Sequence, residues 1–150
     1  MVVFQQDPHI ILKNAYKSNE SSKTCRSLKF FLHFLPSQQK AILENIVYSS
    51  LRDTLNVKEG AKFIYFHEFT EENKSLPHGL FDLKYSEQCV FIKITLLRGR
   101  TVEQKKNLFE KISSRLSETN VLRQEDLICC VMETDPENWS FGSGKTQFLR

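Results

Sequence analysis

The sequence predicts an α+β fold of two layers, in which tandem β-α-β units form a four-stranded sheet with two helices on one face. Two observations lead to this fold class. The chain matches itself after a shift of 64 residues, and each half alternates strand-like apolar runs with one helical apolar stripe. With 150 residues, the chain has the length of one domain that can bury a full core.

The repeat keeps its register across strand, helix and strand. The matched pairs at the shift of 64 are Cys25 and Cys89, Lys29 and Lys93, Leu32 and Leu96, Ser37 and Thr101, Asn56 and Asn120, Val57 and Val121, and Ile64 and Ile128. After a slip of one residue, Glu68 matches Glu133 and Asn73 matches Asn138. We infer a duplication, with an N-terminal extension at residues 1–26 and one domain at residues 27–150, whose halves span about 27–80 and 88–150.

The first half contains two predicted strands and a helix. The apolar run LKFFLHFL at residues 28–35 has the composition of a strand. A helix is expected from Ser37 to Leu55, because the apolar residues there recur at helical spacing. The run KFIYFHEF at residues 62–69 is the returning strand, and residues 70–88 are expected to form a polar connection.

The second half repeats this plan. The run CVFIKITLL at residues 89–97 predicts a strand, and Thr101 and Gln104 have the spacing of a capping box that starts a helix. The apolar stripe of that helix consists of Leu108, Phe109, Ile112 and Leu116. The run DLICCVME at residues 126–133 returns as a strand. With both helices on one face, we expect the other face of the sheet to be buried against further subunits.

Composition and charge narrow the class of partner. The net charge of +3 is small, which suits an anionic small molecule and does not indicate a nucleic-acid partner. No run approaches the roughly 20 apolar residues that span a bilayer, and the first residues lack the pattern of a secretory signal. The four cysteines have no metal-binding spacing, and GSGKT at residues 142–146 lacks the first glycine of a phosphate-binding loop. We therefore expect a cytoplasmic protein without a metal, a cofactor or a membrane partner.

Two arginines one residue apart form the main candidate for a binding site. Arg98 and Arg100 follow the strand of the second half, and at a period of two their side chains leave it on the same side. The helix start at Thr101 comes next, and its free N–H groups also favour an anion. Guanidinium groups bind carboxylates in a bidentate manner, so a bound acid is one interpretation. The other is that both arginines face water or pair with glutamates across a subunit boundary. The equivalents in the first half are Phe34 and Pro36, which favours a functional role.

Three further residues are candidates for the site. Trp139 and Phe141 alternate, so in an extended segment they form one wall of a pocket, or else they pack the C-terminal segment onto the sheet. His33 lies on a predicted strand and is a candidate acid or base, because histidine titrates near neutral pH. A purely structural histidine is the alternative.

The segments LLRGRTVEQK at residues 96–105 and ENWSFGSGKTQFL at residues 137–149, in a duplicated β-α-β chain, resemble the tautomerase superfamily. Within it, the chain looks most like the malonate semialdehyde decarboxylase group, over about residues 28–149. The resemblance implies assembly as a homotrimer and action on small 3-oxo or unsaturated carboxylic acids. It also implies that Arg98 and Arg100 hold the substrate carboxylate and that Trp139 and Phe141 form an aromatic wall.

The catalytic proline of that family has no counterpart in this sequence. In the family it is the first residue of the mature chain, directly before the first strand. The matching position here is about Arg26, whose internal amide cannot act as a secondary amine. The aspartate that the decarboxylase group uses falls near Ala61 or Lys62 and is also missing. Because removing a general acid or base typically costs roughly 10² to 10⁴ in rate, we expect catalysis of the family type to be weak or absent.

Three functional hypotheses stay open on the sequence alone. The first is an enzyme, a tautomerase or decarboxylase relative with a changed mechanism, that keeps the arginine pair and uses a base such as His33. The second is a catalytically inactive relative that binds an acidic metabolite or a protein partner, with residues 1–25 over the former pocket. The third is an oligomeric interaction protein without a ligand. We favour the binding of a small carboxylate ligand, with turnover left open.

Overall fold

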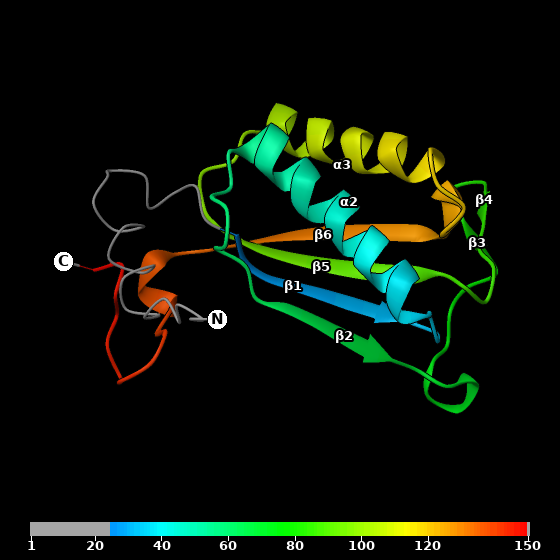
Figure 1. The fold of residues 1–150 in the computed structure, drawn as a ribbon, viewed down its shortest axis with the longest axis horizontal. Helices are drawn as coiled ribbons and strands as arrows, with labels where there is room; N and C mark the ends of the chain where they lie inside the picture. The colour runs from blue at the N-terminus through cyan, green and yellow to red at the C-terminus, as the bar shows by residue number, and fades with distance from the viewer. Residues whose placement is uncertain (1–24, 150) are drawn as a thin grey trace, which may run out of the picture.

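The computed structural model describes residues 25–149 and contains two helices packed on one face of a four-stranded mixed sheet (Figure 1). The strands of this sheet are β1 (Cys25–Leu32), β2 (Ile64–Glu68), β5 (Val90–Leu97) and β6 (Leu127–Thr134). The helices are α2 (Ser37–Leu55) and α3 (Val102–Ser117). Shorter elements are the hairpin strands β3 (Gly79–Leu80) and β4 (Leu83–Lys84) and the 3-10 turns η2 (Glu71–Asn73), η3 (Gln124–Asp126) and η4 (Pro136–Asn138).

The sheet has the symmetry that a duplicated chain requires. Its strand order is β2-β1-β5-β6, in which β1 pairs in parallel with β2, β5 pairs in parallel with β6, and β1 and β5 are antiparallel. Each half therefore contributes one parallel pair joined through one helix. Lys29 lies directly opposite Lys93, so two residues that match in the repeat meet at the centre of the sheet. The predicted fold class is confirmed.

The core lies between the sheet and the two helices. Leu28, Phe30 and Leu32 of β1 and the alternate residues of β5 are buried, as the period of two in a strand requires. The helices contribute Leu43, Ile46, Val47, Leu51, Leu55, Leu108, Ile112 and Leu116. The predicted stripe of α3 is confirmed except at Phe109, which is 38% exposed because it lies on the flank of the helix.

The start of α3 agrees with the predicted capping box. The Gln104 backbone N–H donates to Thr101 Oγ1 at 3.1 Å, and the Thr101 backbone N–H donates to Gln104 Oε1 at 2.9 Å. In contrast, α2 follows Pro36 without a side-chain cap and ends at Asn56, whose φ of 51° is left-handed. Asparagine tolerates that conformation better than most residues, so it terminates the helix.

The connection between the halves contains structure that the sequence did not predict. Residues 70–88 include η2 and the β3–β4 hairpin, whose turn has positive φ values at Phe81 and Asp82. Such turns usually carry glycine or asparagine at the first position, so a phenylalanine there gives no recognisable signal. Except for Cys25 and Arg26, with which β1 begins, the predicted N-terminal extension lies outside the described residues.

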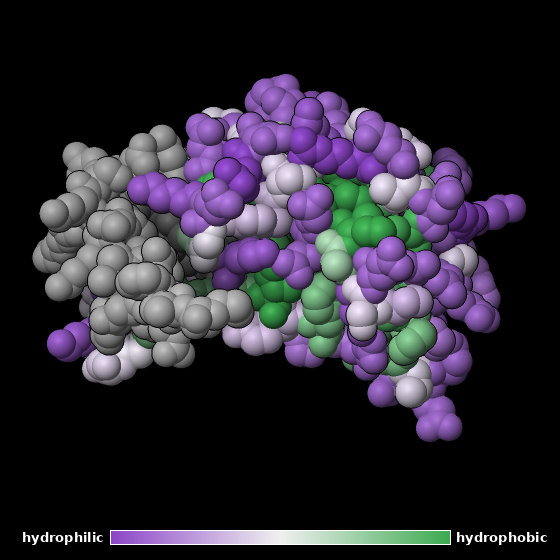
Figure 2. Space-filling model, in the orientation of Figure 1, coloured by the Kyte–Doolittle hydropathy of each residue, from purple (hydrophilic) through white to green (hydrophobic). Residues whose placement is uncertain are grey.

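The helical side of the molecule is hydrophilic. Figure 2 shows polar side chains along the upper edge, where α3 lies, and smaller apolar areas beside α2. Within residues 25–149, neither helix is long and apolar enough to cross a membrane.

Candidate functional site

One end of the sheet collects four of the five predicted site residues. The strands β1 and β2 begin at this end, and β5 and β6 end there, as their pairing requires. Arg98 and Arg100 directly follow β5, and Trp139 and Phe141 follow η4 after β6. In Figure 1 this is the left end, where the C-terminal segment lies. We call it the arginine end.

Arg98 is held by a carboxylate of the same chain. Its Nε donates to Asp135 Oδ1 at 2.6 Å, and one of its terminal nitrogens donates to Asp135 Oδ2 at 3.2 Å. The hydrogen bonds and opposite charges raise the pKa of Arg98 and lower the pKa of Asp135. The two side chains are 65% and 38% exposed, so water competes for this pair and an external carboxylate can exchange with Asp135.

Glu133 fixes the turn that carries the two arginines. Its Oε1 accepts the backbone N–H of Arg100 at 2.9 Å, and its Oε2 accepts from Lys105 Nζ at 2.9 Å. Burial alone would raise the pKa of Glu133, but the bonds from Lys105 and from the Arg100 backbone outweigh burial and lower it. The turn needs Gly99, whose φ of +118° is unfavourable for residues with a side chain. The glutamate therefore stays ionised and holds Arg100 beside Arg98.

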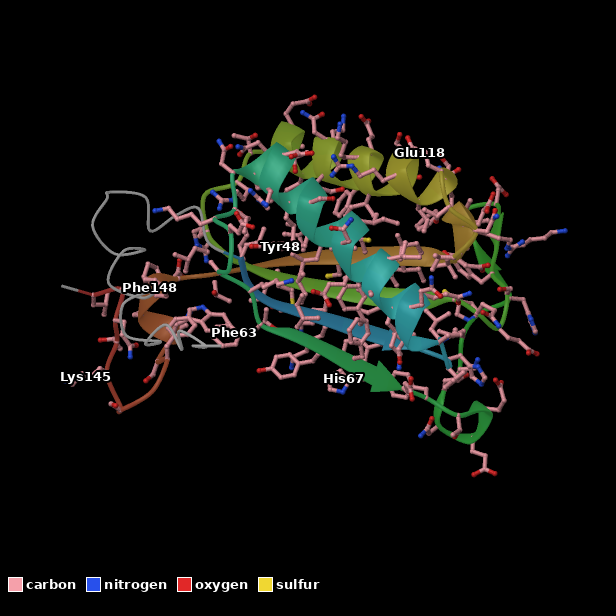
Figure 3. All side chains as sticks on the ribbon, in the orientation of Figure 1. Tyr48, Phe63, His67, Glu118, Lys145 and Phe148 are labelled. Atoms are coloured by element: carbon pink, nitrogen blue, oxygen red, sulfur yellow. The ribbon has the colours of Figure 1, made fainter. Side chains whose placement is uncertain are left out.

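Four aromatic rings form a wall at the arginine end. Trp139 stacks on Phe141 with ring centroids 5.6 Å apart, Phe63 also stacks on Phe141 at 5.8 Å, and Phe148 meets Phe141 edge-on at 5.2 Å. Figure 3 places Phe63 and Phe148 at this end of the molecule. The sequence-based prediction did not include Phe63 and Phe148. The sequence offered a signal for Phe63 alone. This residue lies at the start of a predicted strand, and that strand must begin beside the start of β1.

Thr134 links the aromatic wall to the arginines. Its Oγ1 accepts from Trp139 Nε1 at 2.6 Å, and its backbone carbonyl accepts the N–H of Arg98 at 2.9 Å. The aromatic wall and the guanidinium groups are therefore anchored to the same strand end. This arrangement combines two cations with an apolar surface, which suits a small organic anion.

The start of β1 is irregular. The register shifts between Cys25 and Ser27, which places Arg26 at an irregularity of the strand. Ser27 is 8% exposed, and its Oγ has no hydrogen-bond partner among the described residues. At the position expected for an aspartate, Lys62 donates to Glu44 at 2.6 Å and lies 4.6 Å above the ring of Tyr48. Lys62 therefore interacts with two residues of α2.

His33 lies at the opposite end of the sheet. It follows the last residue of β1, and its Nε2 is 3.3 Å from Glu71 Oε1. Because β1 has 8 residues and a strand rises about 3.3 Å per residue, the two ends are roughly 25 Å apart. Within one chain, the structure therefore does not bring His33 to the arginine pair.

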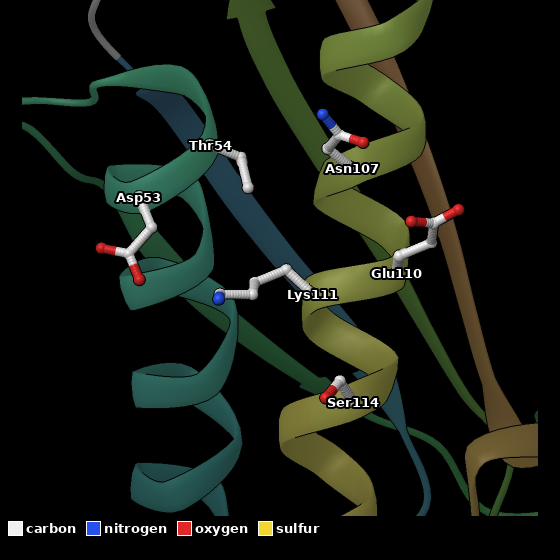
Figure 4. A pocket seen from close by; sticks show the side chains of 6 residues that line it. All are labelled: Asp53, Thr54, Asn107, Glu110, Lys111 and Ser114. Carbon is white, nitrogen blue, oxygen red and sulfur yellow. The ribbon is translucent and has the colours of Figure 1, made fainter.

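Two surface hollows lie on the helical side of the sheet, beside α3. The larger, of about 380 Å³, opens between α2 and α3 (Figure 4). It is lined by the polar residues Asp53, Thr54, Asn107, Glu110, Lys111 and Ser114. The smaller, of about 230 Å³, lies between α3 and β6 and includes Phe109 and Cys129. Burial raises the pKa of the Cys129 thiol to about 12, so it is a poor nucleophile. In the part of the chain that the structure describes, no group of acidic, histidine or cysteine side chains is arranged to hold a metal.

Known proteins share parts of this sequence. The probable tautomerase YusQ of Bacillus subtilis is 27% identical over 107 residues, which cover 71% of this chain and 84% of YusQ. The probable tautomerase YrdN of the same organism is 24% identical over 113 residues, which cover 75% of this chain and 86% of YrdN.

Solved structures agree in fold. A crystal structure of malonate semialdehyde decarboxylase has a TM-score of 0.73 and 22% identity, covering 81% of this chain and 95% of that protein. A fused 4-OT protein described as a symmetric trimer has a TM-score of 0.67 and 19% identity, covering 83% of this chain and 99% of that protein.

The sequence profile of one family matches the region that contains β2, β5, α3 and β6. The profile is that of the family described as "Tautomerase enzyme", and it covers residues 61–142, more than half of the chain. That region includes both arginines and both predicted aromatic residues of the wall. The chain therefore belongs to the tautomerase family.

Proposed function

We propose that the arginine end binds a small oxo or unsaturated carboxylic acid. The observation that carries this proposal is the bidentate pairing of Arg98 with the carboxylate of Asp135 at an exposed position. The guanidinium group is thus already set to hold two carboxylate oxygens, and it is open to exchange with one from solution. Arg100 supplies the second cation, because Glu133 holds its backbone in the adjacent turn.

The aromatic wall supplies the apolar part of the site. A small acid has a carboxylate at one end and a short carbon chain at the other. Trp139 and Phe141 contact the carbon chain while the arginines orient the carboxylate, which excludes water from one side of the ligand. The names of the similar proteins, probable tautomerases and a malonate semialdehyde decarboxylase, support this class of ligand.

We further propose that turnover by the family's proline mechanism is lost or strongly weakened. The residues that enter β1 are Thr24-Cys25-Arg26-Ser27 and contain no proline. Arg26 cannot replace it, because a guanidinium group stays protonated. Lys62 stands near the position of the expected aspartate and is paired with Glu44. The alternative is a non-catalytic oligomeric protein on the same fold, in which the arginines bind no small ligand.

Calorimetric titration with a 2-oxo or 3-oxo acid tests the binding site. Arg98→Ala and Arg100→Ala should each weaken binding by about tenfold to hundredfold, because each removes hydrogen bonds to a charged group. Arg52→Ala is the matched control, because Arg52 is an exposed arginine of α2 and pairs with Glu59. Unchanged affinity in both arginine variants would exclude the site and favour the interaction protein.

An assay of enol–keto conversion of phenylpyruvate tests turnover. We expect a rate close to that of the buffer blank, because the carboxylates beside the arginine pair, Asp135 and Glu133, are engaged by Arg98 and Lys105 and have lowered pKa values, which makes them weak bases. A rate far above the blank that His33→Ala removes would contradict the loss of catalysis. It would also require His33 to come from a neighbouring subunit.

The uncovered face of the sheet supports assembly as a homotrimer. The helices shield one face, while the other exposes large apolar residues such as Met132 at 41% and Tyr65 at 49%. A surface of this kind is usually covered in the assembled protein. The similar fused 4-OT protein is described as a symmetric trimer, which supports the same assembly here. Sedimentation analysis should give the mass of three chains, and a monomer at all concentrations would exclude it.

A further inference from the structure

The sheet face opposite the helices carries two lysines at its centre. Leu28 and Phe30 are buried beneath the helices, so Lys29 between them points to the opposite face. Lys93 does the same, because its neighbours Ile92 and Ile94 are fully buried in the core. We call this surface the open face.

The two lysines lie side by side, and no carboxylate between residues 25 and 149 pairs with either of them. Lys29 is directly opposite Lys93 in the antiparallel pairing of β1 and β5. Like charges in opposite positions of neighbouring strands repel each other and destabilise the pairing. Neither lysine has an ion pair with a carboxylate among residues 25–149, although eight other lysines and arginines do.

The rest of the open face is aromatic, apolar or neutral. On one side of the lysines, Phe31 stacks on His67 at 4.9 Å and meets Phe91 at 6.0 Å. By the same alternation, the described strand residues of this face are Ser27, Lys29, Phe31, Tyr65, His67, Phe91, Lys93, Thr95, Leu97, Ile128, Cys130, Met132 and Thr134. None of them is acidic, so the described strands offer no carboxylate on this face to a lysine.

We propose that the open faces of three chains meet and that a multivalent oxyanion of the phosphate class binds among their lysines. The inference rests on the homotrimer of the proposed function. Covering the face removes water from the ammonium groups, and a desolvated charge needs a partner. Since the described strands of identical faces bring further lysines and no carboxylate, the counter-charge comes from solution. Lysines bind phosphate as flexible point charges, so several of them can share one anion.

Sedimentation equilibrium in chloride and in phosphate buffers of equal ionic strength tests the anion site. Phosphate at about ten times its own dissociation constant should shift the trimer equilibrium about tenfold toward the trimer. Lys29→Gln and Lys93→Gln should lose this response and assemble in chloride at least as well as the unmodified chain. Lys106→Gln should keep the response, because Lys106 is an exposed lysine of α3. A parallel titration with tripolyphosphate distinguishes single phosphates from chained ones.

Two controls separate the possible failures. Circular dichroism shows whether each variant is folded, and Lys29→Arg, which keeps the charge, should retain the phosphate response. A trimer with the same stability in both buffers, or glutamine variants that still respond to phosphate, would overturn the proposal. A chain that is monomeric in both buffers would overturn it together with the homotrimer. Neither result bears on the arginine site, which the calorimetric titration tests separately.

Discussion

The two ends of the sheet are built from equivalent parts but carry different chemistry. Each end has an ion pair between the first turn of a helix and the end of the returning strand, Lys40 with Glu68 and Lys105 with Glu133. These pairs match each other at the repeat's shift after its slip of one residue. At the arginine end, Glu133 also accepts the backbone N–H of Arg100, and no such bond is described for Glu68.

The turn after the strand explains this difference. Gly99 has a φ of +118°, which turns the chain so that the N–H of Arg100 reaches Glu133. The equivalent residues at the other end are Leu35 and Pro36. Leu35 is 3% exposed and joins the core, and a proline has no N–H to donate. One turn therefore carries two cations, of which Arg98 is exposed and Arg100 is half-buried, and the other closes its end with an apolar side chain.

A buried carboxylate also holds the far end of the sheet together. Asp126, the repeat equivalent of Lys62, is 1% exposed. It accepts from the Ser86 backbone N–H at 2.6 Å, from Ser86 Oγ at 2.8 Å and from Arg123 Nε at 2.7 Å. The duplication thus diverged into one end that internal hydrogen bonds hold together and one end with an exposed arginine and a wall of aromatic rings.

Asp126→Ala should have the largest effect on stability. The substitution removes a buried carboxylate and leaves the half-buried Ser86 N–H without its acceptor, so we expect a loss of about 3 kcal/mol in the free energy of unfolding. Urea unfolding followed by circular dichroism measures it. Asp53→Ala, which breaks an exposed pair with Arg115, should cost less than about 1 kcal/mol. Acid binding at the arginine end should persist in Asp126→Ala, and its loss would show that the two ends are not independent.

The same carboxylate predicts a pH dependence. Burial alone would raise the pKa of Asp126, but the bonds from Arg123 and Ser86 outweigh it and lower the pKa. Since the folded pKa lies below the unfolded value of about 3.9, Asp126 stabilises the fold fully above that pH, and this contribution is lost as the pH falls further. The difference in unfolding free energy between the unmodified chain and Asp126→Asn should therefore narrow below about pH 4. A difference that stays constant on acidification would contradict the ionised, bonded carboxylate.

Gly99→Ala should have the next largest effect, and at the arginine end. Alanine is strained at a φ of +118°, so we expect a loss of about 1–3 kcal/mol in stability and a weaker hold of Glu133 on Arg100. Calorimetry should then show reduced affinity for the acid. Gly60→Ala is the matched control, because Gly60 has a φ of +76° with open space around it. Equal affinities in the two variants would mean that the turn does not position the arginines.

Local patterns in the sequence were sufficient for most of the fold. Helix α2 spans the predicted residues 37–55, and the capping box at Thr101 is present, because both depend on side chains within a few residues of each other. The β3–β4 hairpin was missed since its turn uses Phe81 and Asp82 in place of the usual glycine or asparagine.

The site depended on contacts that are distant in the chain. Arg98 pairs with Asp135, which follows 37 residues later in the chain, after α3 and β6. No spacing rule predicts such a pair. His33 was a reasonable base by chemistry alone. Its place far from the arginines follows from the antiparallel pairing of β1 with β5, which apolar runs do not specify.

Asp135→Asn should have the smallest effect, and it should strengthen binding. In the ligand-free chain Asp135 occupies the guanidinium group of Arg98, so an incoming acid must displace it. Asparagine cannot form the bidentate ionic pair, and we expect a gain of about two- to fivefold in affinity for the acid. Glu137→Gln also removes one negative charge near Arg98 but leaves the pair of Arg98 with Asp135 intact, so it should give a smaller gain in affinity. Equal gains in both variants would mean that the ligand responds to the general field of the arginine end. Loss of affinity in Asp135→Asn would mean that Asp135 holds Arg98 in its binding position. The arginine end would then depend on an internal carboxylate, as the far end depends on Asp126.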